Sequence, residues 1–178
     1  MKNTTYTEAL ATTLKNEGGV DASGIGGQGV SNLGVTQVAF DQYNKKRNLP
    51  IRDVRKISPQ EAETLYYEDY FKGPGLDQLP GPIAKQVFDF GVNSHPTTAI
   101  KHLQKLVGTK VDGILGPKTA KAVNEYVIDN GDIALQNKLL DSRAAFLQSI
   151  ADKNPKEYKK VLKGWMNRVE AMRPKEKK

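Results

Sequence analysis

Residues 5–34 read TYTEALATTLKNEGGVDASGIGGQGVSNLG, where an amphipathic segment passes directly into a glycine-rich one. Leu10, Leu14 and Glu17 recur at helical spacing, which predicts a first helix whose apolar stripe ends in a carboxylate. Two glycines then stop the helix, since glycine adopts the left-handed cap conformation at little cost. The rest of the stretch, as far as Gly34, lacks periodicity and predicts a loop or a small β-hairpin.

The remainder of the chain predicts helices and no convincing strand. Thr36 is a candidate cap for the second helix. Ser58-Pro59-Gln60-Glu61 combines a serine cap, a proline at the first helical position and a capping-box glutamate, which is a strong helix start. We expect the later helices at 37–47, 58–71, 82–93, 96–107, 117–130, 132–151 and 155–172. Linkers are short, which favours two lobes with a shared core over two tethered domains.

The composition excludes several classes of protein. The 178 residues include no cysteine and two histidines, which excludes a disulfide scaffold and a cysteine nucleophile and makes a metal site improbable. No apolar run approaches the ~20 residues of a membrane span. The start MKNTTYTEAL has no apolar core and does not look like a secretory signal. A hydrolase built from these residues depends on carboxylates or hydroxyls, and we expect no metal and no organic cofactor.

Positive charge gathers in the second half of the chain. Residues 1–90 hold 10 basic and 11 acidic side chains, whereas residues 91–178 hold 17 basic and 9 acidic ones. This asymmetry suits a polyanionic partner, either nucleic acid or an anionic cell envelope, or it only keeps the surface soluble. The basic residues are spread over several helices and no nucleic-acid module is recognisable, so we expect no specific nucleic-acid binding.

Glu17 is the most informative candidate for chemistry. Its place at the end of an apolar stripe implies partial burial, and the negative end of the helix dipole lies there. Both effects raise a carboxyl pKa, which a general acid needs near neutral pH. The alternative is an ordinary exposed glutamate at a helix end.

Several segments, in one order over nearly the whole chain, resemble the muramidases of glycoside hydrolase family 108. The helix that ends in Glu-Gly-Gly, with a loop ending Gly-Val-Thr-Gln, is similar to the opening of that family. Phe88-Asp89-Phe90-Gly91-Val92-Asn93-Ser94 looks like its FDxxVNSG segment. Residues 103–119 look like its predicted peptidoglycan-binding region, and residues 143–147 and 164–169 match its close.

The resemblance implies a lysozyme-like, mainly α-helical, two-lobed fold. Residues 1–92 would form the catalytic lobe, residues 93–172 a peptidoglycan-binding lobe that shares the core, and residues 173–178 a basic tail. The implied enzyme is an N-acetylmuramidase that cleaves the β-1,4 bond from N-acetylmuramic acid to N-acetylglucosamine, with Glu17 as general acid.

The expected partners are peptidoglycan glycan strands and an anionic envelope surface, and we expect a monomer. Because no secretory signal is recognised, we expect a phage-type endolysin that accumulates in the host cytoplasm. It would reach the periplasm and cell wall through a holin or another signal-independent route.

The second catalytic group stays open. The family has an aspartate nine residues after the glutamate, where this chain has Gly26, and Ser31 replaces a threonine. Asp21 can be the second acid or a turn former, and Ser31 can hold the nucleophilic water or cap a turn. Glu17 can also work alone, as in lytic transglycosylases, where the 6-hydroxyl of the substrate replaces water. A non-catalytic wall-binding protein is the remaining alternative.

Four more residues are candidates for substrate binding: Asn32, Thr36, Tyr66 and Asn93. Asn93 can hydrogen-bond a sugar or N-acetyl group, or simply end its helix. Tyr66 belongs to an aromatic cluster that can stack on sugar rings, although such a stripe more often forms core. Asp89 lies on the same helical face as Asn93 and can have a purely structural role. The turn at residues 112–119 is needed for the fold, and the resemblance gives it a binding role.

Overall fold

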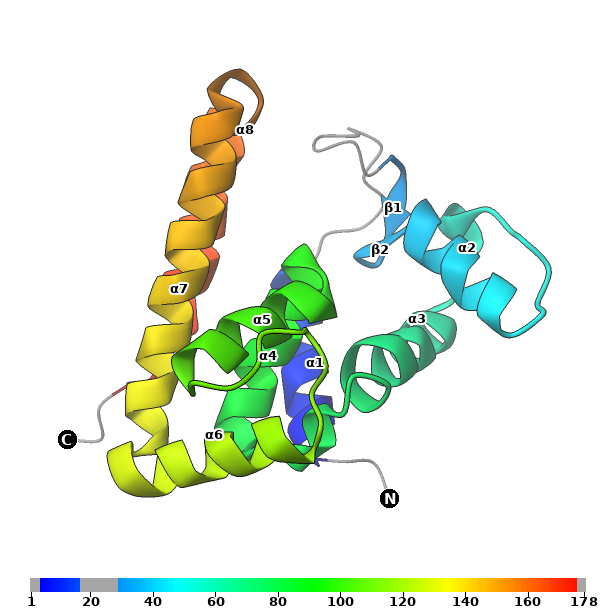
Figure 1. The fold of residues 1–178 in the computed structure, drawn as a ribbon. Helices are drawn as coiled ribbons and strands as arrows, with labels where there is room; N and C mark the ends of the chain where they lie inside the picture. The colour runs from blue at the N-terminus through cyan, green and yellow to red at the C-terminus, as the bar shows by residue number, and fades with distance from the viewer. Residues whose placement is uncertain (1–3, 17–28, 176–178) are drawn as a thin grey trace. The chain divides into compact units, whose positions relative to one another are not determined.

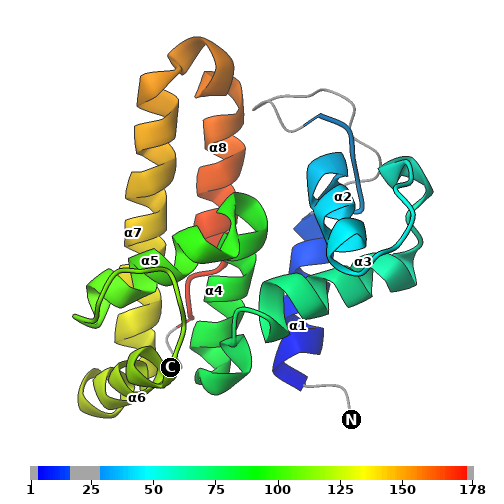
Figure 2. The same cartoon turned by 45° about the vertical axis from the view of Figure 1, so that its right-hand side comes forward.

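The computed structural model describes residues 4–16 and 29–175 of the chain, and contacts divide it into two compact units, Met1–Gly73 and Pro74–Lys178 (Figures 1 and 2). Both units are built from helices, and the sheet in the described residues is a two-stranded antiparallel hairpin. The expectation of a mainly α fold with a small hairpin is therefore confirmed. The assignment of catalytic and binding lobes to residues 1–92 and 93–172 stays a prediction.

The first unit carries the hairpin and short helices. Its elements are α1 (Thr4–Asn16), β1 (Ser31–Asn32), β2 (Val35–Thr36), α2 (Gln37–Lys46), the 3-10 turn η2 (Val54–Lys56), α3 (Pro59–Leu65) and the π-helix η3 (Tyr66–Lys72). The capping box predicted at Ser58 and Glu61 is present: the Ser58 hydroxyl accepts from the Glu61 amide at 3.2 Å, and the Glu61 carboxylate accepts from the Ser58 amide at 2.9 Å.

The helix expected over residues 58–71 changes type at Tyr66. A π-helix has more residues per turn than an α-helix, so residues five apart come closer to one face. Tyr66 and Phe71, five apart, are 1% and 0% exposed. The ring of Phe71 lies 5.3 Å from that of Tyr6 in α1. The aromatic run thus packs against α1 through a wider helical turn, a feature that the sequence pattern did not predict.

The second unit is a helical assembly around α4 and α7. Its elements are η4 (Leu76–Gln78), α4 (Gly81–Ser94), α5 (Pro96–Leu106), α6 (Pro117–Asn130), α7 (Asp132–Lys153) and α8 (Pro155–Ala171). α4 packs on α5 and α7, while α7 and α8 form a long antiparallel hairpin (Figures 1 and 2). Asp132 is the first helical residue of α7, and Gly131 with φ 84° occupies the cap position.

A buried ion group joins α4, α7 and α8. The Asp89 carboxylate accepts from Arg143 Nη1 at 2.7 Å and from Arg168 at 3.1 and 2.8 Å. The side chains of Asp89 and Arg143 are each 2% exposed, and that of Arg168 is 12% exposed. Asp89 therefore has a structural role, as the sequence allowed.

The Asp89 carboxyl is held in its ionised form. Burial works to raise the pKa of this carboxyl, but hydrogen bonds from Arg168 and the charge of Arg143 outweigh burial and bring the pKa below its ordinary value. A lowered pKa stabilises the fold above the unfolded value of ~3.9. That stabilisation is lost as the pH falls through the folded-state pKa.

The turn between α5 and α6 is organised by one buried amide. Gln104 is 1% exposed, its side-chain N–H group donates to Asp112 Oδ1 at 2.9 Å and to the Ile114 carbonyl at 3.0 Å, and its oxygen accepts from the Gly113 amide at 2.8 Å. Gly113 has φ +79°, and a Cβ there would lie 2.4 Å from Thr97 Cγ2. The structural role expected for the turn at 112–119 is thus explained.

Removing the charge of Asp89 is expected to cost much stability. Asp89→Asn leaves two guanidinium groups without a buried counter-charge, and losing one partner of such a pair typically costs about 3–5 kcal/mol. Asp141→Asn is the matched control, because its pair with Arg173 is on the surface and worth under about 1 kcal/mol. Urea unfolding at neutral and acid pH measures both. Loss of stability below pH ~4 should be weaker in Asp89→Asn than in the wild type; equal stability of all three proteins would contradict the buried role.

Two glycine substitutions should act in opposite directions. Gly113→Ala forces a side chain into a left-handed position against Thr97, which should lower the unfolding free energy by about 1–3 kcal/mol. Gly164 lies inside α8 with no atom near an added Cβ, so Gly164→Ala should raise the unfolding free energy by about 0.5–1 kcal/mol. Thermal unfolding gives both signs, and a stabilised Gly113→Ala would refute the close packing of this turn.

Candidate active site

The candidate catalytic residues fall on both sides of the boundary of the described chain. Glu17 and Asp21 lie outside the described residues, as does Gly26. α1 is described to Asn16, the residue before Glu17, and its buried side chains include Tyr6 and Thr13. Of the predicted catalytic group, Ser31 is the member that the structure describes.

Ser31 opens a tight β-hairpin. It pairs with Thr36, and Asn32 pairs with Val35. The two turn residues, Leu33 and Gly34, have φ values of 51° and 74°, and positive φ at both positions is typical of a type I′ turn. Three of the predicted site residues, Ser31, Asn32 and Thr36, are therefore brought together on this hairpin.

Leu33 occupies a backbone position that L-residues with large side chains rarely adopt. Tyr66 supplies a compensating contact, because its hydroxyl donates to the Leu33 carbonyl at 3.0 Å. The Tyr66 ring is 1% exposed, which favours packing over sugar stacking. A direct sugar contact of Tyr66 stays a prediction.

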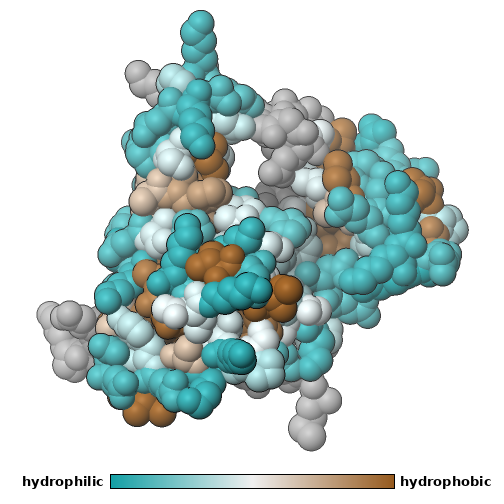
Figure 3. Space-filling model, viewed as in Figure 1, coloured by the Kyte–Doolittle hydropathy of each residue, from teal (hydrophilic) through white to brown (hydrophobic). Residues whose placement is uncertain are grey.

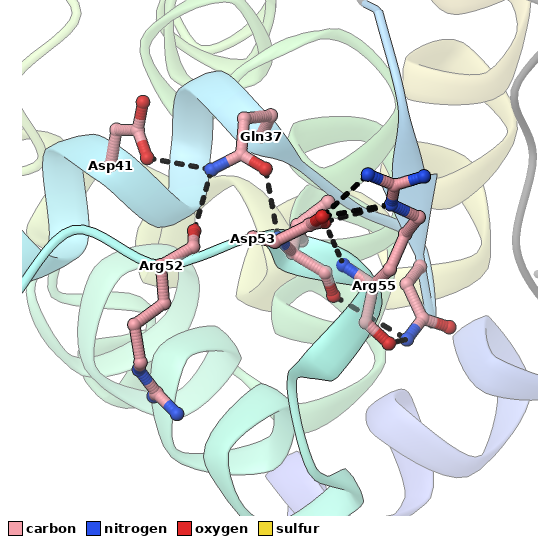
Figure 4. Close-up of polar contacts among 7 residues, drawn as sticks. Gln37, Asp41, Arg52, Asp53 and Arg55 are labelled. Carbon is pink, nitrogen blue, oxygen red and sulfur yellow. Dashed lines mark hydrogen bonds and ion pairs between the residues drawn. The ribbon is translucent and has the colours of Figure 1, made fainter.

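The hairpin is tied to its surroundings by a polar network (Figure 4). The side chain of Gln37 makes three hydrogen bonds. Its Nε2 donates to Asp41 Oδ1 at 2.7 Å and to the Arg52 carbonyl at 2.8 Å, and its Oε1 accepts from the backbone N–H of Val54 at 2.8 Å. Asn32 Nδ2 donates to the Arg55 carbonyl at 3.0 Å. Together these bonds hold β1, the start of α2 and η2 in one arrangement.

The side chains of Thr36 and Asn32 are engaged in this local structure. Thr36 Oγ1 accepts from the Ala39 amide at 3.2 Å and caps α2, as expected from the sequence. The Ser31 side chain is partly exposed and makes no hydrogen bond within residues 4–16 and 29–175. Among the three, the Ser31 hydroxyl is the one available to a water molecule or a substrate.

The carboxyls near the hairpin are set up to stay ionised. Hydrogen bonds from Arg55 lower the pKa of Asp53 to about 2, and the pKa of Glu61 is lowered by the Ser58 amide and by Arg52. In the second unit the pKa values of Asp89 and Asp112 are also lowered. Each described carboxyl with a resolved pKa shift is therefore shifted away from the state that a general acid needs.

Asn93, the remaining predicted site residue, lies near the end of α4 in the second unit. Its Oδ1 is buried and accepts no hydrogen bond from the described residues. A buried acceptor without a donor is uncommon in folded proteins. The sugar-binding role of Asn93 stays a prediction.

The sequence did not predict two parts of the polar network around the hairpin. Asp53 and Arg55 do carry a local sequence signal. An aspartate carboxylate readily accepts a hydrogen bond from the backbone N–H two residues later, which forms an Asx turn. Gln37 carries no such signal, since its partners at Arg52 and Val54 are 15 and 17 residues away.

The described residues show neither a metal site nor a membrane span. No group of three or more Asp, Glu or His side chains converges within residues 4–16 and 29–175 in a way that could hold a metal ion. Within the same ranges, no helix is both long enough and apolar enough to cross a membrane.

Comparison with known proteins divides the chain into two matched regions. Residues 10–94 match the family described as glycosyl hydrolase 108, and residues 98–170 match the family described as predicted peptidoglycan domain. A solved structure of SagA from Brucella abortus is similar over 97% of each chain, with 25% identity and a TM-score of 0.75. No curated protein matches this chain significantly. The expected family resemblance and the expected lysozyme-like α-helical fold are confirmed.

Replacing Gln37 should loosen the hairpin. Gln37→Leu keeps the approximate size but leaves the Val54 amide and the Arg52 carbonyl without their partner, which should cost about 1–3 kcal/mol. Gln42→Leu, on the exposed side of the same helix, should change stability by under about 0.5 kcal/mol. Urea unfolding compares the two. If both variants unfold like the wild type, the network does not hold the hairpin.

Proposed function

We propose that the chain, whose residues 10–94 match the glycosyl hydrolase 108 family and whose residues 98–170 match a predicted peptidoglycan domain, is an N-acetylmuramidase with Glu17 as its general acid. At the coarser level the protein is a glycoside hydrolase that degrades peptidoglycan. The bond proposed is the β-1,4 link from N-acetylmuramic acid to N-acetylglucosamine. The observation that carries the proposal is the succession of the two matched regions over residues 10–94 and 98–170.

The proposed reaction needs one proton donor and one water molecule. Glu17 protonates the glycosidic oxygen as the bond to the anomeric carbon breaks and positive charge develops on the sugar ring. Water then attacks the anomeric carbon and loses a proton to a base. This sequence gives one reducing end and one free hydroxyl for each bond that is cleaved.

Two features support Glu17 as the donor. The described carboxyls with resolved shifts have lowered pKa values, so they are poor proton donors near neutral pH. The buried positions of α1, among them Tyr6 and Thr13, follow helical spacing. The same spacing predicts that Glu17, four residues beyond Thr13, lies on this buried face of the helix.

Ser31 is the proposed holder of the attacking water. Its hydroxyl is partly exposed, and the strand that carries it is fixed through Asn32 and through the pairing with Thr36. A fixed hydroxyl can orient water at small entropic cost. Asp21 as a second acid is the competing arrangement, and a one-acid transglycosylase is the third.

The proposed setting is a cell envelope. Glycan strands of peptidoglycan are the substrate, and the basic second unit suits an anionic envelope surface. We propose a monomer with an endolysin role, which accumulates in the host cytoplasm and reaches the wall through a holin or a similar route.

Glu17→Gln tests the acid directly. The substitution keeps the size of the side chain but removes the transferable proton, so lysis of purified sacculi should fall by at least about 10²-fold. Thermal unfolding and sedimentation with sacculi should be unchanged. Glu8→Gln, an exposed position of α1, is the matched control and should keep wild-type activity. Activity of Glu17→Gln above about a tenth of the wild type would end the assignment.

The pair Ser31→Ala and Asp21→Asn separates the two candidates for the second group. If Ser31 holds the water, Ser31→Ala should lower turnover by about 10-fold or more, while Asp21→Asn has a small effect. The reverse order would identify Asp21 as the second acid. Turnover is measured by release of reducing sugar ends, and no loss in either variant would indicate a one-acid mechanism.

A further inference from the structure

The excess positive charge of the chain lies in the second unit, and part of it gathers at one end of the α7–α8 hairpin. Residues 1–73 hold 9 basic and 9 acidic side chains, and residues 74–178 hold 18 and 11, which gives the whole net charge of +7. Residues 152–163, around the turn between α7 and α8, contain five lysines and two acidic residues, a balance of +3. We call three of these lysines, Lys153, Lys156 and Lys163, the lysine tip.

Three arginines toward the other end of this hairpin are paired with carboxylates. Arg143 and Arg168 share the Asp89 carboxylate, and Arg173 contacts both Asp141 and Glu170. By contrast, Lys153, Lys156 and Lys163 are exposed and form no ion pair with any residue in the described part of the chain. The tip therefore gathers three exposed lysines without an ion pair in the described part of the chain, whereas Lys138 is the exposed lysine nearer the start of α7.

The shape of the second unit presents the tip to solvent. α7 and α8 extend past α4 and α5 toward their connecting turn (Figures 1 and 2), and α8 packs chiefly on α7. Near Asn154 the two helices bury little besides Ala151, which is 4% exposed. The end of the hairpin is hydrophilic on the face drawn in Figure 3.

The chemistry of the tip favours a polymer in water over a bilayer. Amphipathic helices that lie in a membrane interface insert large apolar side chains among the lipids. Among the described residues between 134 and 171, none of the large apolar side chains is exposed. Lysine ammonium groups on flexible stems suit phosphate groups as point charges, with no need for a planar fork.

We propose that the lysine tip is a docking surface for a phosphate-bearing polymer of the cell wall, a flexible chain of phosphodiester units attached to peptidoglycan. One anionic phosphate per repeat complements lysines on both helices of the hairpin. The docking concentrates the enzyme at the wall, and it is independent of which group performs catalysis.

Co-sedimentation with purified sacculi tests the proposal. The full-length triple variant Lys153→Glu, Lys156→Glu, Lys163→Glu is compared with a control of equal charge change, Lys45→Glu, Lys56→Glu, Lys138→Glu, at exposed positions elsewhere. On sacculi that carry the phosphate polymer, the tip variant should bind at least about tenfold more weakly than the wild type. The control variant should bind like the wild type. Hydrofluoric acid removes the polymer, and on such sacculi all three proteins should bind equally.

Several outcomes would overturn the proposal. They are undiminished binding of the tip variant to untreated sacculi, equal losses in both variants, and wild-type binding that is insensitive to removal of the polymer. Tighter binding of the wild type to anionic phospholipid vesicles or to duplex DNA than to the wall would also overturn it, in favour of a membrane or nucleic-acid partner. Cleavage of polymer-free sacculi and thermal unfolding are measured alongside. Unchanged values in the tip variant keep a docking defect separate from a failure of the proposed muramidase activity.

Discussion

The Asp89 carboxylate is the anchor of the second unit. It lies on α4, and it holds Arg143 of α7 and Arg168 of α8 by three hydrogen bonds. Removing these charges from water is costly, and a single carboxylate facing two guanidinium groups leaves a net positive charge at the site. Arg143 adds a further desolvation cost, because its Nε and Nη2 are buried without an acceptor among the described residues. The face of the Phe90 ring, 5.3 Å from the guanidinium carbon, compensates part of this cost.

This arrangement explains how one unit combines a rigid base with an extended end. At the base of the α7–α8 hairpin, the ion group and a small apolar cluster of Leu140, Leu147 and Val169 fix both helices. Toward Asn154 the hairpin loses this support, and Lys153, Lys156 and Lys163 are exposed to solvent. In the first unit the corresponding constraint is neutral: Gln37 fixes the hairpin that presents Ser31 through three hydrogen bonds.

Local signals in the sequence predicted much of the fold. The capping box at Ser58, the cap at Thr36 and most helix limits depend on neighbours within four residues, which a pattern of residues records directly. The polar interior was not predictable in this way. Arg143 and Arg168 are 54 and 79 residues from Asp89, and nothing in their surroundings distinguishes them from surface arginines. The π-helix at Tyr66 also depends on packing against α1, and helical periodicity alone gave an ordinary helix. In the candidate site, Ser31, Asn32 and Thr36 are close in sequence and lie together on the hairpin. The support from Gln37 was not predictable, because it depends on contacts with residues distant in sequence.

We propose that the chain cuts glycan strands at the muramic acid bond by hydrolysis. Mass spectrometry of the fragments that the wild-type protein releases from purified sacculi tests this most directly. We expect muropeptides with intact peptide stems and reducing N-acetylmuramic acid ends. Fragments with anhydro-muramic ends would contradict hydrolysis and indicate a transglycosylase. Free peptides released from intact glycan strands would contradict the glycosidase assignment altogether.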